Sequence, residues 1–126
     1  MIRKDRRIVY VAGAYSADNT LDTLNNMRIG MQTGAELFRA GFTPFVPWLD
    51  YHFCLMIDKK YLTIEMFYQY SMDFLECSDA VYLVDNPHNA KSTGAIKELE
   101  MAMVLGLPVF TDKTLLFKWA EEEGNE

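Results

Sequence analysis

Short apolar runs rich in β-branched residues alternate along the chain with longer stretches in which apolar residues recur every three or four positions. The short runs are typical of strands buried on both faces of a parallel sheet, and the longer stretches are typical of helices. We expect strands at Ile8–Ala12, Phe42–Val46, Ala80–Val84 and Pro108–Thr111. Pro44 cannot donate to a sheet ladder, so the second strand is expected at an edge of the sheet.

The longer stretches predict helices over Leu21–Ala40, Thr63–Cys77, Gly94–Leu105 and Lys113–Glu122. In the first helix, residues spaced by three and four positions predict one apolar stripe that faces the core. This stripe consists of Leu24, Met27, Met31, Ala35 and Phe38. In the second helix, Asp73 falls at the border between the apolar side and the polar side. The aromatic segment from Pro47 to Lys60 fits either an irregular flap over a pocket or a short helix buried in a subunit contact.

The alternation of strands and helices predicts an α/β fold with parallel strands. We expect a flavodoxin-like or Rossmann-like three-layer sandwich with a four- or five-stranded parallel sheet. The 126 residues are enough for one hydrophobic core, so residues 1–126 are predicted to form a single domain.

The net charge of −6 argues against a protein that binds polymeric nucleic acid, because such proteins present a basic face. Only Cys54 and Cys77 are present, and this usage suits a reducing compartment. The basic residues before Ile8 resemble the start of a signal peptide, but the apolar run that follows reads better as the first strand. No apolar run approaches the roughly 18 residues of a membrane span. We therefore expect a cytoplasmic protein without membrane contact.

The most informative stretch runs from Asp85 to Pro108. A buried strand ends in an acid, a polar loop follows, and a helix then begins with Glu98 one turn inside it. In parallel α/β proteins this is where ligands bind. A helical wheel predicts Ala95, Leu99, Ala102 and Met103 on the buried side, with Glu98 at its edge and Glu100 in solvent. Glu98 is then either a helix-stabilising charge or a functional group.

Ser92 and Thr93 are suitable caps for this helix, and Gly94 would let a ligand approach free backbone N–H groups. The loop after the first strand, which contains Gly13 and Ser16, is expected at the same edge of the sheet. The sequence Asp50-x-His52-x-Cys54 superficially resembles metal ligands, but no second ligand cluster accompanies it. We expect no metal and no cofactor, since the chain also lacks a Walker loop and a dinucleotide-binding glycine motif.

Three blocks of the chain together resemble the nucleoside 2-deoxyribosyltransferase superfamily, which includes the 2'-deoxynucleoside 5'-monophosphate N-glycosidases. The blocks are Val9–Gly13, Asp73–Val81 and Ser92–Pro108. The third is the most specific and reads Ser-x-Gly-x-x-x-Glu-Leu-x-x-Ala-x-x-x-Gly-x-Pro. The matching positions are few and are spread over most of the chain.

This resemblance implies that Glu98 is a nucleophile that attacks the anomeric carbon of a 2-deoxyribosyl group. It implies that Asp73 assists the departing base and that Tyr10 lies beside the sugar and the nucleophile. Ser92 matches a phosphate-binding serine of the monophosphate hydrolases, where the transferases carry an aspartate. Lys91 could supply positive charge to the same phosphate. The implied chemistry is that of a retaining glycosidase.

Three functional interpretations follow. The first is an N-glycosidase acting on a (deoxy)nucleoside 5'-monophosphate, and the second is a transferase that exchanges bases between deoxynucleosides. The third is a nucleotide-binding sensor or accessory module without turnover. Glu100, which stands where the hydrolases usually have glycine, favours this third reading. In each case the expected partner is a small nucleotide or nucleoside, and the resemblance implies a homodimer or higher homo-oligomer whose neighbouring subunit completes the site.

Overall fold

The computed structural model describes residues 7–15, 17–47 and 53–124, and it shows four strands in one parallel sheet. The strands are β1 (Ile8–Ala12), β2 (Thr43–Phe45), β3 (Ala80–Leu83) and β4 (Val109–Phe110). Their order in the sheet is β2-β1-β3-β4. The predicted α/β fold with a parallel sheet is thus confirmed. The predicted edge position of the strand that contains Pro44 is confirmed as well, because β2 pairs with β1 and with no other strand of the described residues.

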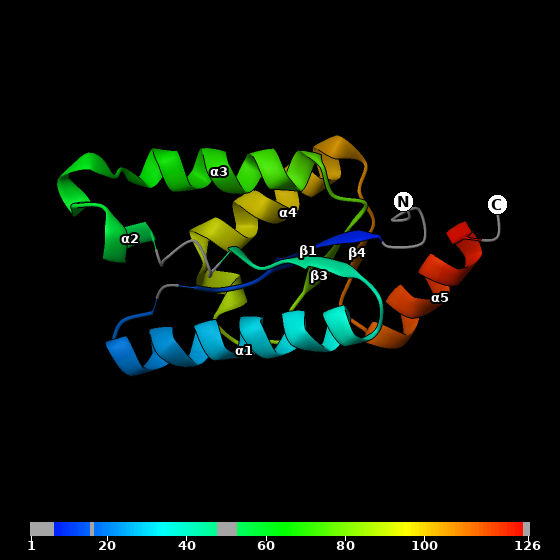
Figure 1. Cartoon of the computed structure of the whole chain (residues 1–126). Helices are drawn as coiled ribbons and strands as arrows, with labels where there is room; N and C mark the ends of the chain where they lie inside the picture. The colour runs from blue at the N-terminus through cyan, green and yellow to red at the C-terminus, as the bar shows by residue number, and fades with distance from the viewer. Residues whose placement is uncertain (1–6, 16, 48–52, 125–126) are drawn as a thin grey trace.

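Five helices and two 3₁₀ turns connect and cover these strands (Figure 1). The helices are α1 (Thr20–Arg39), α2 (Phe53–Met56), α3 (Ile64–Glu76), α4 (Thr93–Leu105) and α5 (Lys113–Gly124), and the turns are η3 (Lys59–Tyr61) and η4 (Asn89–Lys91). Specific residues define several of these ends. Asn19, Thr63 and Ser92 each accept a backbone N–H at a helix start, and Gly106 ends α4 in the left-handed conformation.

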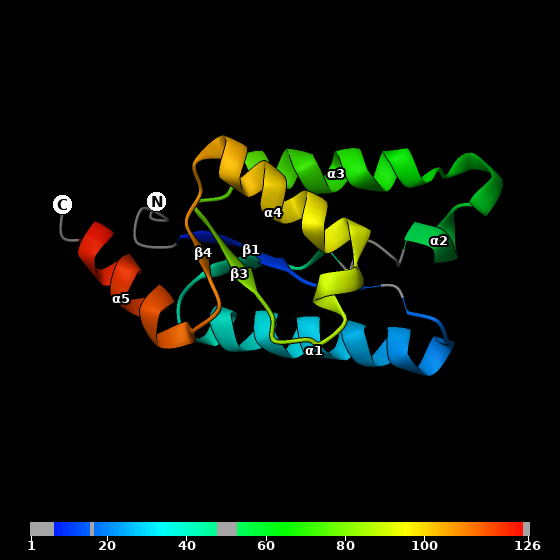
Figure 2. The ribbon, with the colours of Figure 1, turned by 180° about the vertical axis from the view of Figure 1, so that it is seen from behind.

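The sheet has a hydrophobic core on each of its faces, so the molecule has three layers (Figures 1 and 2). Alternate residues of β1 point to opposite sides. Val9 and Val11 pack into the core under α1 and α5, whereas Tyr10 and Ala12 pack into the core under α3 and α4. The middle of β1 therefore carries a tyrosine hydroxyl into the α3–α4 side of the molecule.

Four of the five residues in the apolar stripe predicted to bury α1 are exposed, and Met27 packs against the core, so that prediction was wrong for most of the stripe. Leu24 is 53% exposed and Phe38 is 62% exposed. The buried residues of this helix are Asn26, Gly30, Thr33, Gly34 and Leu37. The reason is a close approach to the sheet, because a Cβ atom added to Gly34 would lie 2.5 Å from Cγ2 of Val46. Small residues allow this spacing, and Leu24, Met31 and Phe38 lie on the outer side.

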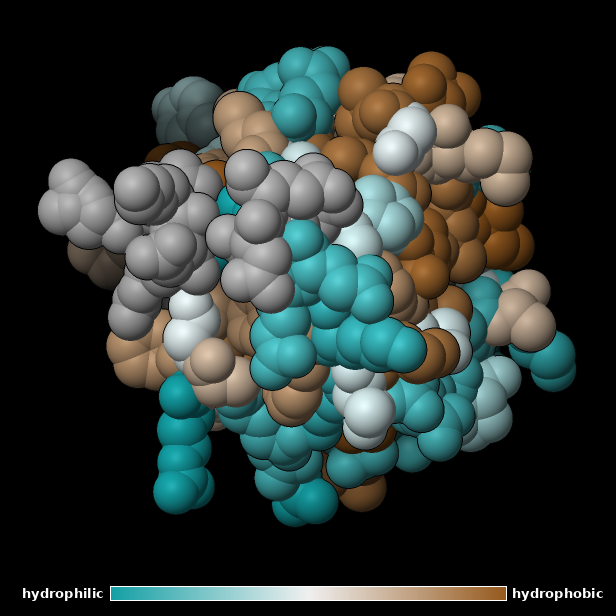
Figure 3. Space-filling view, turned by 90° about the vertical axis from the view of Figure 1, so that its right-hand side faces the viewer, coloured by the Kyte–Doolittle hydropathy of each residue, from teal (hydrophilic) through white to brown (hydrophobic). Residues whose placement is uncertain are grey.

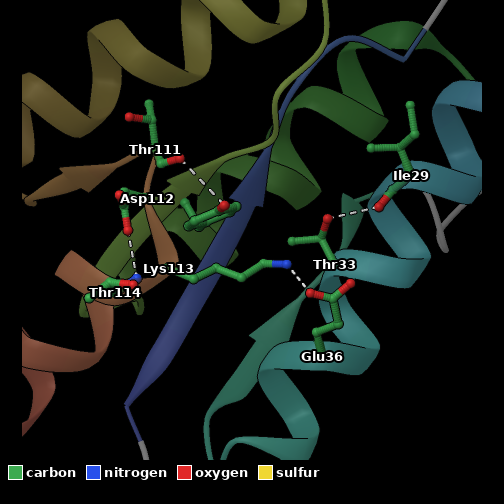
Figure 4. Close-up of polar contacts among 8 residues, drawn as sticks. Ile29, Thr33, Glu36, Thr111, Asp112, Lys113 and Thr114 are labelled. Carbon is green, nitrogen blue, oxygen red and sulfur yellow. Dashed lines mark hydrogen bonds and ion pairs between the residues drawn. The ribbon is translucent and has the colours of Figure 1, made fainter.

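An ion pair joins α1 to the start of α5 on this side of the sheet (Figure 4). The ammonium group of Lys113 pairs with the carboxylate of Glu36. Just before it, the carboxylate of Asp112 accepts the backbone N–H of Thr114 at 2.7 Å and so caps the first turn of α5. These contacts fix the chain where it leaves β4.

The end of the molecule where α4 finishes presents apolar surface. The last turns of α4 expose Met103, Val104 and Leu105. Figure 3 shows the corresponding face, on which apolar residues gather at the upper right and polar residues dominate the lower part.

The sequence allowed two interpretations of the segment from Pro47 to Lys60, an irregular flap or a short helix buried in a subunit contact. The structure describes part of this segment. From Phe53 to Met56 the chain forms the single helical turn α2, and η3 follows it. Leu55 and Met56 are exposed in the isolated chain, so burial in a subunit contact stays a prediction. Residues 48–52 lie outside the described part. Within the described residues, none of the helices combines the length and the apolar character needed to cross a membrane.

Candidate active site

A hydrogen bond between Tyr10 and Glu98 joins β1 to α4 inside the molecule. The hydroxyl of Tyr10 donates to Oε2 of Glu98, and the two residues are 0% and 9% exposed. On the helix, Glu98 lies between Ala95 and Ala102 on the buried face. These two alanines have the smallest side chains that still favour a helix, so α4 approaches β1 closely enough for a glutamate to reach the tyrosine hydroxyl.

The helical wheel was therefore correct about Ala95 and Ala102 but wrong about two other positions. Glu98 lies in the middle of the buried face and not at its edge. Met103, which was predicted to be buried, is 81% exposed. Both differences have one cause. Because α4 contacts the sheet along Ala95 and Ala102, its buried face is rotated from the predicted one toward Glu98 and away from Met103.

Burying a carboxylate is unfavourable unless hydrogen bonds compensate for the lost water. The Tyr10 hydroxyl supplies such a bond and holds the Glu98 side chain in one orientation. Its bond engages Oε2, one of the two carboxylate oxygens. A carboxylate that is shielded from bulk water and oriented in this way is suited to nucleophilic attack or to stabilising a cationic centre.

The start of α4 offers hydrogen-bond donors one turn away from Glu98. Oγ of Ser92 accepts the N–H of Ala95 at 3.1 Å, which leaves its own proton able to donate. In the described part of the chain, the N–H groups of Thr93 and Gly94 have no acceptor. A Cβ atom added to Gly94 would meet only Oγ of Ser92, at 3.9 Å, so the space in front of this glycine is open. An anion could approach the backbone here.

The loops that follow β1 and β3 lie together at the carboxyl edge of the sheet. β1 and β3 are neighbours, and the next strands, β2 and β4, lie on opposite sides of this pair. This arrangement is a topological switch point, where α/β proteins bind their ligands. Gly13 is buried at the end of β1, and the backbone N–H of Ala14 donates to Oδ1 of Asn89 at 2.7 Å. Ser16, a predicted binding residue in the same loop, lies outside the described residues.

The structure places the other two predicted residues on the surface. Asp73 is exposed, and its carboxylate accepts a hydrogen bond at 2.8 Å from the side-chain amide of Gln69 on the same helix. It is thus bonded along α3 and not to the Tyr10–Glu98 pair. Lys91 is exposed at the end of η4, one residue before Ser92. Their roles stay predictions.

A chain of aromatic rings from three elements extends from the ring of Tyr10. Phe45 on β2 lies 5.5 Å from Tyr10 between ring centroids and stacks on Phe74 of α3 at 4.1 Å. Tyr70 of α3 continues the cluster to Phe53 of α2, at 5.6 Å. The cluster combines buried packing with exposed ring surface, since Phe53 and Phe74 are both partly open to solvent. Such surfaces suit a planar ligand.

Three asparagines in this region were not singled out from the sequence. Asn26, Asn86 and Asn89 hydrogen-bond one another or the backbone of both loops. One signal for them was present, because an asparagine such as Asn26 is unfavourable in a helix interior and needs a reason to be there.

A scan against protein-family models and a search among curated proteins both find no match to this chain. The assignment to the nucleoside 2-deoxyribosyltransferase superfamily accordingly stays a prediction from the sequence motifs.

Proposed function

We propose that the protein is an N-glycosidase that cleaves the base–sugar bond of a (deoxy)nucleoside 5'-monophosphate, with Glu98 as the nucleophile. The observation that carries the proposal is the buried hydrogen bond from Tyr10 to Glu98 at the switch point of the sheet. A carboxylate is unfavourable to bury, and buried acids held in one orientation occur preferentially at functional sites. A reactive carboxylate needs this orientation.

In the proposed reaction, an oxygen of Glu98 forms a bond to C1' as the bond from C1' to the base nitrogen breaks. The base leaves with the electron pair of that bond and takes a proton from an acid or from water. Water then attacks C1', and Glu98 leaves as a carboxylate, so that the configuration of the sugar is retained. Tyr10 supports these steps by holding the carboxylate through Oε2.

The phosphate of the substrate is proposed to lie at the start of α4. The Ser92 hydroxyl and the N–H groups of Thr93 and Gly94 are donors of the kind that bind phosphate, and the positive end of the helix dipole favours an anion there. Lys91 adds a positive charge one residue away. Gly94 precedes Glu98 by four residues, or about one helical turn, and this spacing suits a 5'-phosphate and its C1' atom.

The aromatic cluster beside Tyr10 is proposed to bind the base. Phe45 contacts the tyrosine that holds the nucleophile and stacks on Phe74, so a base bound beside Phe45 would have its glycosidic bond near Glu98. Stacking of this kind is tolerant of which base is bound. The protein is further proposed to be cytoplasmic and to form a homodimer or a higher homo-oligomer, as the resemblance implies.

A second candidate is a nucleotide-binding module without turnover. The position of Asp73 favours it, because the residue expected to protonate the base is exposed and bonded to Gln69. In the enzymatic reading, the departing base takes its proton from water that is hydrogen-bonded to Asp73.

The test is to incubate the purified protein with ribo- and deoxynucleosides and their 5'-monophosphates and to measure released base. We expect release from monophosphates and loss of release in Glu98→Gln, which keeps the size of the side chain. Base release that persists in this variant would rule out the mechanism. Release only when a second free base is added would assign a transferase, and nucleotide binding without release would assign the binding module.

A further inference from the structure

Asn89 connects the ends of β1 and β3 through its side-chain amide. Its Nδ2 donates to the carbonyl oxygen of Val84 at 2.7 Å, and its Oδ1 accepts the N–H of Ala14 at 2.7 Å. A planar amide that makes both bonds allows little relative movement of the two backbone segments. Asn89 therefore fixes the loop after β1 against the loop after β3.

A second bridge of amides runs parallel to this one. Nδ2 of Asn86 donates to Oδ1 of Asn26 at 2.8 Å, and Nδ2 of Asn26 donates to the carbonyl oxygen of Tyr15 at 3.0 Å. Asn26 and Asn86 are only 2% and 6% exposed. Buried polar groups that are paired in this way specify a single arrangement of the segments they join.

The two joined loops carry the two halves of the proposed site. The loop that ends in η4 continues directly into Ser92 and the start of α4, where the phosphate is proposed to bind. The other loop continues from β1, which carries Tyr10. We infer that Asn89 is a positioning residue that sets the gap between these halves and thereby the affinity for the 5'-phosphate of the substrate. This inference rests on the proposed function.

Replacing Asn89 with alanine removes both bonds without touching the Tyr10–Glu98 pair. The loops then sample more arrangements, and the substrate must order them when it binds. Two lost hydrogen bonds correspond to about a tenfold loss of affinity. We expect KM for a monophosphate to rise about tenfold and kcat to change less than about threefold, since the reacting groups keep their geometry. The KM for a nucleoside, which has no phosphate, should stay within about twofold.

The experiment measures KM and kcat for a deoxynucleoside 5'-monophosphate and for its nucleoside, with wild type, Asn89→Ala and Asn25→Ala. Asn25 is exposed on α1 and controls for the loss of an asparagine. Melting curves show whether each variant is folded. Should Asn89→Ala fail to fold, Asn86→Ala breaks the second bridge on the same loop and carries the same expectation.

A KM that rises for the monophosphate alone supports the inference. Equal changes for both substrates, or unchanged KM values in a folded variant, overturn it while leaving the proposed function standing. Failure of wild type to release base or to bind either compound overturns the proposed function, and the positioning role falls with it.

Discussion

At the scale of single residues, the molecule places a carboxylate where it is least expected, on the buried face of a helix. Glu98 is tolerated there because Tyr10 donates to it and because the neighbouring alanines leave room for its side chain. The start of the same helix shows a second unusual position, since open space lies in front of Gly94. Both features can be tested by changes that leave the backbone in place.

Replacing Tyr10 with phenylalanine removes one hydroxyl and keeps the ring that packs against Phe45. Glu98 then loses a buried donor, so the free energy of unfolding should fall by about 1–3 kcal/mol. Base release should fall as well, because the nucleophile is no longer held. Urea denaturation and the base-release assay measure the two effects. Tyr68→Phe is the control, because it removes a hydroxyl from a half-buried tyrosine on α3. Unchanged stability in Tyr10→Phe would contradict the importance of this bond.

Replacing Gly94 with alanine separates folding from ligand binding. The added Cβ meets no close neighbour, and alanine favours a helix, so stability should stay the same or rise by up to about 1 kcal/mol. Affinity for a 5'-monophosphate should fall, because the methyl group occupies the approach to the backbone. Calorimetric titration measures the affinity.

The matched control for that change is Gly106→Ala at the other end of α4. Gly106 has φ of 74°, so alanine there should destabilise the protein by about 1–2 kcal/mol without changing affinity. Equal affinity of wild type and Gly94→Ala would argue against a phosphate at this helix start.

At the scale of elements, α1 shows why periodicity alone can mislead. Its spacing correctly indicates a helix, and the structure places its ends within one residue of the predicted ones. The side that packs, however, is decided by how closely the helix approaches the sheet, and Gly30, Gly34 and Thr33 permit a short distance. Spacing of apolar residues carries no information about that distance.

Replacing Gly34 with alanine tests this close approach. The new Cβ overlaps Cγ2 of Val46, so α1 must shift or Val46 must change its rotamer, and stability should fall by about 1–3 kcal/mol. The contrasting change is Leu24→Gln on the outer side, which should alter stability by less than about 0.5 kcal/mol. Denaturant melts of both variants provide the measurement. A large loss in Leu24→Gln would show that the outer stripe is covered in solution.

At the scale of the whole molecule, the parallel sheet and the edge position of β2 were predictable, and the residues of the site were predictable only in part. Continuous apolar runs, Pro44 and the alternation of elements are enough for a parallel sheet with β2 at its edge. Tyr10 and Glu98 were named from sequence, and the structure joins them. Asn89 escaped notice because its role depends on the meeting of two loops 75 residues apart, which no local pattern records.

The loss of folding stability at high pH is a further property of the whole molecule. Burial, and after it the negative charges of Asp112 and Asp85, raise the pKa of Tyr82 above its ordinary value of 10.0. The folded state therefore holds this proton more tightly than the unfolded state. The resulting stabilisation is complete below pH 10 and is lost as the pH rises through the folded-state pKa.

Tyr82→Phe lacks this titration. Between about pH 9 and about pH 11, the wild type should lose more of its free energy of unfolding than the variant does. Chemical denaturation at a series of pH values measures the two slopes. Parallel slopes would show that another group controls alkaline unfolding.

The central claim is that Glu98 forms a covalent bond to the sugar, and mass spectrometry of the protein during turnover tests it most directly. The protein is mixed with a deoxynucleoside 5'-monophosphate, quenched in acid within the first turnovers and digested. We predict an added deoxyribosyl 5'-phosphate on the peptide that contains Glu98, and its absence in Glu98→Gln. Base release with the added group on another peptide, or with equal yield in Glu98→Gln, would contradict the claim.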